Sequence, residues 1–306
     1  MTAGGHPDEL EAIALLERLL PKAPPGETWI GDDAAVLSRS SGRLLLASDC
    51  LVEGVHFDRA LSSLADVGWK SLAVNLSDVA AMAGTPTAAV VAVAGGSLED
   101  LERIYEGMVE AAQRYGCPVV GGDLSAGSAL VISVAILGHV PAGRPVLRSG
   151  ARPGDALFVT GPLGRSAAGL RALRDGHPAA ALAGAHRRPL PRLQEGRAAA
   201  AAGAGAMIDV SDGLALDLDR LASASGVGIV LDEVPVWPGA TLADALFGGE
   251  DFELVFAAPD PVAVAAAFRA SSLRAPVQIG RCSGDRTERL LAGSPLAVEG
   301  YVHRLG

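Results

Sequence analysis

The chain has 306 residues, of which 49% are hydrophobic and 20% are charged, and its formal net charge at pH 7 is −10. This length predicts two domains of about 150 residues, each large enough for its own hydrophobic core. The acidic balance argues against binding to nucleic acids or anionic membranes, because both require clustered cations. We find neither a secretory signal nor an apolar stretch of the roughly 20 residues that cross a bilayer, so we expect a cytoplasmic protein.

The first half of the chain alternates between helical and extended patterns. A helix is predicted to begin at Asp8, with Glu11 as its capping-box partner, and to end at Pro21. Further helical patterns lie near residues 65–83 and 98–115. Apolar runs of strand length, rich in Val, Ile and Leu, occupy residues 34–37, 44–48, 88–94, 118–122 and 129–140.

A second alternation follows a segment rich in Pro, Gly and Arg at residues 141–155, which marks the best candidate for a domain boundary. We therefore expect an N-terminal domain over 1–147 and a C-terminal α/β domain over 148–306. Strands are predicted at residues 156–161, 207–210, 228–234, 253–258 and 276–280. Helices are predicted near residues 164–175, 192–203, 213–225 and 260–270.

Aspartates recur next to the predicted strands. They are Asp32 and Asp33 before the strand at 34–37, Asp49 after 44–48, Asp123 after 118–122, and Asp209 and Asp212 around the end of 207–210. Open α/β sheets gather ligands at strand ends. Asp78 differs, because it lies on a helical pattern among small apolar residues, where a carboxylate is poorly hydrated.

Each of these acids has an ordinary structural explanation when it is taken alone. Asp32 fits a turn, Asp212 fits the N-cap of the following helix, and Asp78 fits a satisfied core acid. If several carboxylates converge, however, each pair at about 4 Å repels by about 4 kcal/mol at an effective dielectric constant near 20, so the cluster requires cations. Ligands that are all oxygen suit a hard ion, and Mg²⁺ bound together with phosphate groups is the usual occupant.

Common phosphate-binding motifs are missing from the sequence. There is no G-x-x-x-x-G-K-[ST] loop, no H-R-D or D-F-G motif, and no G-x-G-x-x-G fingerprint after a strand. An enzyme that handles phosphate must therefore use metal ions, backbone N–H groups at glycine pairs and an arginine such as Arg148. The pairs Gly121–Gly122 and Gly248–Gly249, each followed by an acid, supply such turns.

Two further residues keep alternative roles open. His56 fits a general base, a substrate contact or a packed strand residue. Tyr105 fits either a ring that stacks on a base or surface packing. A nucleophilic pair of Cys50 and His56 is disfavoured, because neither a helix start nor an orienting acid accompanies the thiol. The cysteines at 50, 117 and 282 and the scattered histidines show no zinc spacing.

Eight motifs, in order and spacing, resemble the thiamine-monophosphate kinase family. They are GDDAAVL, SDCLVEGVHF, AVNLSDVAAMAGTP, VVGGDLSAG, RSGARPGDALFVTG, RRPLPR, IDVSDGLALDL and GGEDFEL. That family shares an ATP-binding superfamily with aminoimidazole ribonucleotide synthetase and selenophosphate synthetase. The resemblance implies a two-domain α/β fold of α+β type, whose N-terminal mixed sheets join into a barrel in a homodimer. It also implies that ATP and several Mg²⁺ ions bind in a cleft between the domains.

The resemblance also assigns roles to individual residues. The implied metal ligands are Asp33, Ser48, Asp49, Asp78, Asp123, Asp209 and Asp212. The implied nucleotide contacts are Tyr105, Gly122, Asp123, Arg148 and Ser211, and the implied contacts to thiamine monophosphate are His56, Glu250 and Arg304. The catalytic set is then expected to be Asp33, Asp78, Asp123, Asp212 and Arg148.

Departures from the family pattern fall on Ala47, where Ser or Thr is usual, on Cys50, and on Arg304, where an aromatic residue often closes the substrate site. The change at Ala47 bears on the coordination of one metal ion, and the change at Arg304 bears on contacts to the thiazole ring. The expected reaction is direct ATP-dependent phosphorylation of thiamine monophosphate, without a phosphoenzyme. The alternatives are an enzyme like aminoimidazole ribonucleotide synthetase and a non-catalytic regulator that binds Mg-nucleotide.

Overall fold

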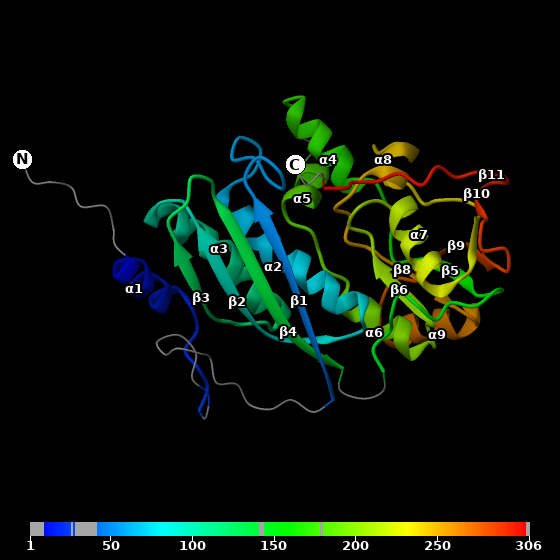
Figure 1. Ribbon diagram of the computed structural model, residues 1–306, viewed down its shortest axis with the longest axis horizontal. Helices are drawn as coiled ribbons and strands as arrows, with labels where there is room; N and C mark the ends of the chain where they lie inside the picture. Colours follow the sequence, from blue (N-terminus) through cyan, green and yellow to red (C-terminus); the bar gives the residue numbers. More distant parts are fainter. Residues whose placement is uncertain (1–8, 26, 28–41, 141–143, 178–179, 304–306) are drawn as a thin grey trace, which may run out of the picture. The chain divides into compact units, whose positions relative to one another are not determined.

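The structure, a computed structural model, describes residues 9–25, 27, 42–140, 144–177 and 180–303. The chain forms two compact units (Figure 1). Unit 1 comprises Met1–Leu76 and Pro86–Ala142, and unit 2 comprises Ser77–Thr85 and Gly143–Gly306. The division passes through the helix α2 (Leu64–Ala81), whose end from Ser77 belongs to unit 2. None of the described helices combines the length and the apolarity that a membrane span requires.

Unit 1 is built around a four-stranded sheet in the order β1-β4-β2-β3. Its other elements are α1 (Glu9–Leu19), β1 (Arg43–Val52), β2 (Thr85–Ala94), α3 (Leu98–Tyr115), β3 (Val119–Ser125) and β4 (Val131–Val140). Strands β1 and β4 are antiparallel, whereas β2 and β3 are parallel. Helix α3 begins at a capping box of Ser97 and Asp100 and ends at Gly116, which adopts the left-handed conformation.

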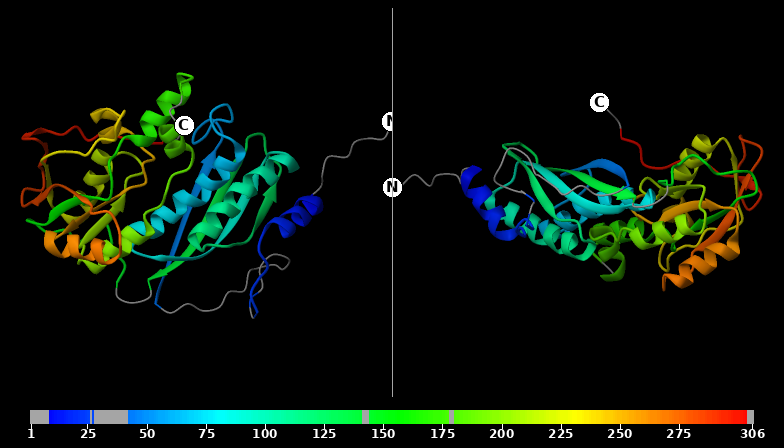
Figure 2. Two further views of the ribbon diagram at one scale, coloured as in Figure 1. Left: turned by 180° about the vertical axis from the view of Figure 1, so that it is seen from behind. Right: turned by 90° about the horizontal axis from the view of Figure 1, so that it is seen from below.

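The two faces of this sheet differ in burial. Helices α2 and α3 cover one face (Figures 1 and 2), and there Ile132, Val134 and Ile136 of β4 are fully buried. The alternation of side chains along a strand sends their neighbours to the other face. On that open face Leu46, which is 79% exposed, lies opposite Leu137. Leu44 and Val90 are also exposed, so the open face is apolar.

Unit 2 contains a seven-stranded sheet in the order β11-β10-β7-β9-β5-β8-β6, with helices around it. Only β7 and β10 pair in parallel among its described strand pairs. The strands are β5 (Ala156–Val159), β6 (Ala206–Asp209), β7 (Gly228–Leu231), β8 (Leu254–Ala258), β9 (Val277–Ser283), β10 (Arg289–Leu291) and β11 (Ser294–Pro295). The helices are α4 (Arg165–Arg174), α5 (Ala180–Arg187), α6 (Leu193–Ala201), α7 (Leu214–Ser225), α8 (Leu242–Phe247) and α9 (Pro261–Ala270).

The core of unit 2 explains why its central strands are continuous apolar runs. Every residue of β5, β6 and β8 is buried, which requires cover on both faces of the sheet. On one face α7 contributes Leu218 and Leu221 to the core. Elsewhere Phe256 stacks between Phe158 and Phe268, with ring centroids 5.2 and 6.1 Å apart. The core therefore fixes the strand ends from which the site residues of this unit project.

The structure corrects several boundaries that we expected from the sequence. Strands β1 and β3 extend beyond their apolar runs, so Asp49 and Asp123 lie inside strands rather than after them. Asp212 is not an N-cap, because α7 begins at Gly213 with φ 117°. The short elements α8, β10 and β11 were not predicted. Asp8 and the predicted strand at 34–37 lie outside the described residues.

Candidate functional site

Two of the predicted acids of unit 2 lie near the C-terminal end of α2. Asp209, the last residue of β6, is only 5% exposed. Ser77 donates a hydrogen bond from Oγ to Asp209 Oδ2 at 2.7 Å. Because Asp78 is the next residue of the same helical turn and is half-buried, this bond joins β6 to the turn that carries Asp78.

Asp212 lies in a network with an acid that sequence reasoning did not select. Asp217 on α7 is fully buried and accepts the backbone N–H groups of Ser211 and Asp212 at 3.1 and 3.0 Å. Arg220 bridges the two acids, 2.5 Å from Asp212 Oδ2 and 2.7 Å from Asp217 Oδ1. Burial raises the pKa of Asp217 to about 7, although its backbone hydrogen bonds act in the opposite direction. Asp217 therefore shapes the turn that presents Ser211 and Asp212.

In unit 1 the position of Asp49 is set by the helical motif AVNLSD. The backbone N–H of Asp49 donates to Asn75 Oδ1 at 2.9 Å, and Asn75 Nδ2 donates to the carbonyl of Ser71 at 2.9 Å. Asn75 is fully buried, so α2 anchors β1 at this residue. Ser48 and Asp49 are consecutive residues of a strand and point to opposite faces of the sheet. Their side chains cannot both ligate one ion.

Asp123 lies on β3, at the other edge of the same sheet. Strands β4 and β2 separate β1 from β3, a lateral distance of about 14 Å at roughly 4.8 Å per strand. Unit 1 therefore does not bring Asp49 and Asp123 together as a pair. Position 122 requires glycine because its backbone lies close to that of Val91. A Cβ at this position would lie 1.9 Å from the carbonyl oxygen of Val91.

The predicted six-acid cluster is only partly assembled within the described residues. Unit 2 joins the turn that bears Asp78 to Asp209, and it places Asp212 three residues beyond Asp209. Within the described ranges, no group of three or more His, Cys, Asp or Glu side chains is arranged to hold a metal ion. Asp33 and Arg304 lie outside those ranges.

The geometry of His56 narrows the roles that the sequence left open. Its Nδ1 accepts the backbone N–H of Val52 at 3.1 Å, and its carbonyl oxygen accepts from Lys70 Nζ at 3.0 Å. An Nδ1 atom that accepts a hydrogen bond carries no proton, so the neutral ring carries its proton on Nε2. His56 lies in the turn after β1, not in a strand, and it is suited to donate from Nε2 rather than to act as a base at Nδ1.

Two other residues also have environments that bear on their expected roles. Tyr105 is 1% exposed, so its ring lies in the core rather than on the surface, where both sequence interpretations, base stacking and surface packing, place it. Its ring packs in the core of unit 1, and burial raises the pKa of its hydroxyl. Burial and the neighbouring Asp49 also raise the pKa of the Cys50 thiol, which agrees with the view that it is no nucleophile.

The two nucleotide contacts expected in unit 2, Arg148 and Ser211, lie on loops and differ in their exposure to solvent. Arg148 is exposed, and its carbonyl oxygen accepts from Ser225 Oγ at 3.0 Å, so its backbone is fixed to the end of α7. Ser211 is half-buried, and its N–H group is held by Asp217. The side chain of Arg148 thus projects into solvent from an anchored backbone.

Unit 2 also contains a cavity of about 60 Å³, lined by polar and apolar groups in similar measure. Of its lining residues, sequence reasoning selected only Glu250. The other charged or hydroxyl-bearing lining residues are Arg165, Ser166, Arg188, Arg192, Asp251 and Glu253. Arg188 and Arg192 come from the motif RRPLPR, and Asp251 and Glu253 come from GGEDFEL, which were recognised as motifs without roles for these residues. Arg165 and Ser166 begin α4, outside both motifs.

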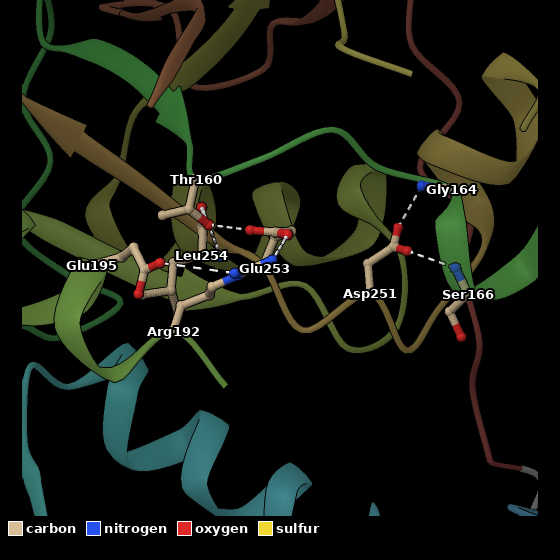
Figure 3. Close-up of polar contacts among 8 residues, drawn as sticks. All are labelled: Thr160, Gly164, Ser166, Arg192, Glu195, Asp251, Glu253 and Leu254. Atoms are coloured by element: carbon tan, nitrogen blue, oxygen red, sulfur yellow. Dashed lines mark hydrogen bonds and ion pairs between the residues drawn. The ribbon is translucent and has the colours of Figure 1, made fainter. Parts of the chain in front are cut away.

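Two carboxylates, those of Asp251 and Glu253, line this cavity, and Figure 3 shows their polar contacts. Glu253 accepts a hydrogen bond from Thr160 Oγ1 at 2.6 Å and forms an ion pair with Arg192. Asp251 accepts the N–H groups of Gly164 and Ser166, at 2.5 and 3.0 Å, where α4 begins. Burial raises the pKa of Asp251 to about 6. These contacts join the strand β8 region to the start of α4.

Glu250 is the cavity residue with the most unusual backbone. Its φ of 66° lies in the left-handed region, which costs a non-glycine residue about 1 kcal/mol or more. The conformation is held by the N–H of Glu250, which donates to the carbonyl oxygen of Ser211 at 2.8 Å. Its side chain reaches His186, with 3.2 Å between Oε2 and Nδ1.

Comparisons with known proteins cover both units. Residues 31–140 match the family model of the AIR synthase related protein N-terminal domain, and residues 152–292 match that of its C-terminal domain. The chain is 40% identical over 282 residues to the thiamine-monophosphate kinase of Rhodopirellula baltica, covering 84% of each protein. It is 37% identical over 296 residues to that of Methanospirillum hungatei, covering 94% of this chain and 98% of the relative. The structure of AaThiL complexed with AMPPCP and TMP aligns with a TM-score of 0.78 at 33% identity, covering 97% of both chains.

Proposed function

This chain belongs to the thiamine-monophosphate kinase family, and we propose that it transfers the γ-phosphoryl group of ATP to thiamine monophosphate, giving thiamine diphosphate and ADP. The observation that carries the proposal is identity to kinases of this name over nearly the whole chain, through both units. The mixed α/β fold of the two units is shared with the AaThiL complex that holds an ATP analogue and TMP.

The transfer is proposed to be direct and in line. A phosphate oxygen of thiamine monophosphate forms a bond to the γ-phosphorus, while the bond from that phosphorus to the β,γ-bridging oxygen breaks and ADP leaves with the electron pair. A phosphomonoester loses its second proton near pH 6, so at pH 7 the attacking oxygen needs little help from a base. This agrees with His56, whose Nδ1 already accepts a backbone N–H group.

We propose Mg²⁺ ions as the cofactor, since the available donors are carboxylate and hydroxyl oxygens. The proposed ligands are Asp33, Ser48, Asp49, Asp78, Asp123, Asp209 and Asp212. Bound Mg²⁺ would neutralise the charge of the two phosphate-bearing substrates. The donor chemistry fits this group, and Arg220 already supplies a positive charge beside Asp212.

The remaining proposed roles belong to groups that bind and orient. Arg148, Gly122 and Ser211 contact the nucleotide phosphates, where arginine and backbone N–H groups stabilise the charge of the transferred phosphoryl. His56, Glu250 and Arg304 contact thiamine monophosphate. Tyr105 is left with a packing role, because its ring is buried.

We also propose that the protein is a cytoplasmic homodimer that binds no nucleic acid. The proposal rests on the acidic net charge and on the apolar open face of unit 1, where Leu44 and Leu46 are 64% and 79% exposed. A contiguous apolar sheet face exposed in a single chain is typical of a protein interface. Pairing of two such faces would give the barrel that the family resemblance implies.

The kinase proposal is tested by incubating the purified protein with ATP, Mg²⁺ and thiamine monophosphate and by separating the products chromatographically. We expect thiamine diphosphate and ADP in equal amounts. Tight nucleotide binding without any thiamine diphosphate would instead identify a regulator. ATP turnover only with an amide-bearing ribonucleotide would identify an enzyme like aminoimidazole ribonucleotide synthetase.

A further inference from the structure

His186 lies behind the cavity of unit 2 rather than in its wall. It is a residue of α5 with 6% exposure, whereas its neighbours Gly184 and Ala185 line the cavity. Its Nδ1 lies 3.2 Å from Glu250 Oε2 and 3.1 Å from Ser166 Oγ. A cavity-lining carboxylate is therefore contacted by a buried histidine that does not itself reach the cavity.

The contacts of His186 bear on which ring nitrogen carries a proton, because Nδ1 lies within 3.2 Å of both the Glu250 carboxylate and the Ser166 hydroxyl. An unprotonated Nδ1 would direct its lone pair at a carboxylate oxygen, which is repulsive at 3.2 Å. A protonated Nδ1 can donate its hydrogen to Glu250 Oε2, and the oxygen of the Ser166 hydroxyl can accept a share of the same N–H. The arrangement thus favours the ring with Nδ1–H, in which His186 is a donor to Glu250.

The frame around this contact is rigid. Helices α4 and α5 approach so closely at Gly169 that a Cβ there would lie 2.2 Å from the carbonyl oxygen of Leu182. Asp251, the residue after Glu250, accepts the N–H of Ser166 at 3.0 Å. Ser166, His186 and Glu250 are therefore held in one frame by contacts independent of the histidine itself.

Glu250 is thus fixed at both ends. Its backbone is held in the left-handed conformation by the bond to Ser211, and its carboxylate is held by His186. Asp251 and Glu253 also line the cavity, but Asp251 accepts the N–H groups at the start of α4 and Glu253 pairs with Arg192, while Arg165 and Arg188 line the cavity too. The carboxylate of Glu250 itself accepts N–H donors or pairs with a positive charge.

We propose that His186, supported by Ser166, is a positioning residue that holds the Glu250 carboxylate toward the cavity so that it binds the amino-bearing, cationic heterocyclic end of thiamine monophosphate. This inference rests on the proposed function, in which Glu250 contacts that substrate. It assigns the cavity to the ring end of the substrate and leaves the phosphate end to the proposed metal ligands.

The test is steady-state kinetics of His186→Leu, His186→Asn, Ser166→Ala and Glu250→Gln, with both KM values and kcat measured. His186→Leu removes the donor, and we expect the KM for thiamine monophosphate to rise about tenfold or more, the scale of one hydrogen bond to a charged group. The KM for ATP and kcat should change less than about threefold, because His186 acts on substrate binding alone. His186→Asn places an amide donor near the position of Nδ1 and should restore most of the affinity.

A double-mutant cycle with Glu250→Gln separates positioning from general damage. If His186 acts through Glu250, His186→Leu should change the KM by less than about twofold in the Glu250→Gln background. His177→Leu, which removes an exposed histidine just beyond α4, is the matched control. Thermal melting of every variant reports whether the fold is kept, and Ser166→Ala provides a second test if His186→Leu is unstable.

The outcomes distinguish this inference from the proposed function. Additive effects in the cycle, or His186→Asn no better than His186→Leu, would overturn the positioning role. A normal KM for His186→Leu or Ser166→Ala beside a raised KM for Glu250→Gln would do the same. A normal KM for Glu250→Gln would remove Glu250 from the site and the inference with it, while the kinase activity stands. No thiamine diphosphate from the unmodified protein would refute the proposed function itself.

Discussion

The acids of the two units have different surroundings. In unit 1 Asp49 and Asp123 lie exposed on edge strands of one sheet. In unit 2 Asp209 is 5% exposed and bonded to Ser77, and Asp217 is fully buried and bonded to two backbone N–H groups and Arg220. An exposed carboxylate is hydrated by water, whereas a buried one requires donors from the protein. Substitutions in unit 1 should therefore affect activity alone, and those in unit 2 should also affect stability.

Asp212 lies between these extremes, since its side chain is 27% exposed and pairs with Arg220. We expect Asp212→Asn to lower kcat at least about 100-fold while the fold is kept, because a metal-held phosphoryl transfer depends on that charge. Asp219→Asn, on the helix α7 that follows Asp212, is the matched control, because this acid also pairs with an arginine, Arg289, at 2.8 Å. Near-normal turnover of Asp212→Asn would remove this residue from the site.

The free energies of unfolding of Asp217→Ala, in unit 2, and Asp123→Ala, in unit 1, compare the two units directly. Removing Asp217 leaves the N–H groups of Ser211 and Asp212 without their acceptor and takes from Arg220 one of its two carboxylate partners, so we expect a loss of about 3–5 kcal/mol in the free energy of unfolding. Asp123→Ala should change it by less than about 0.5 kcal/mol, as is usual at exposed positions. Urea unfolding of both variants measures the difference, and equal losses would show that the contrast between the units is wrong.

The open face of unit 1 gives a third test. Leu46→Asp places a charge at a residue that is 79% exposed in one chain but would be buried in a dimer. We expect a loss of about 2 kcal/mol or more in association, enough to shift the protein to monomer at micromolar concentration. Sedimentation measures the oligomeric state, and Val262→Asp on α9, where the residue is 77% exposed, is the matched control. A monomeric parent protein, or an unchanged dimer, would contradict the proposed interface.

The carboxyl of Asp251 beside the cavity makes stability depend on pH. The pKa of Asp251 is about 6 in the folded chain and about 3.9 in an unfolded one, so between these values the folded state binds more protons. The free energy of unfolding should therefore fall as pH rises from about 4 to about 6, by at most about 1.4 kcal/mol per pH unit from this group. Asp251→Asn should remove that fall. Denaturant unfolding at a series of pH values tests it, and identical slopes in the two proteins would refute the raised pKa.

The sequence predicted the order of most elements, because buried strands such as β5 and β8 are continuous apolar runs and helices such as α3 have clear caps. It missed α8, β10 and β11, which have only six, three and two residues. Patterns this short carry no recognisable period.

Candidate site residues were found where acids stand out against apolar surroundings, as Asp78 and Asp209 do. Sequence reasoning missed His186, Asp217 and Arg220, because their roles depend on contacts that the fold creates. Asp217 could have been noticed as a second acid, five residues after Asp212 and in the first turn of the helix predicted there. His186 gave no such signal, since its partners Ser166 and Glu250 are 20 and 64 residues away in the chain.

The central proposal is that acids of both units bind divalent ions together with the triphosphate. Its most direct test is to count Mn²⁺ ions, as a spectroscopic substitute for Mg²⁺, bound per chain in the presence of a non-hydrolysable ATP analogue. The unmodified protein should bind more than one ion, and Asp49→Asn in unit 1 and Asp212→Asn in unit 2 should each lose at least one. An unchanged count in either variant, or no nucleotide-dependent binding at all, would contradict the proposal.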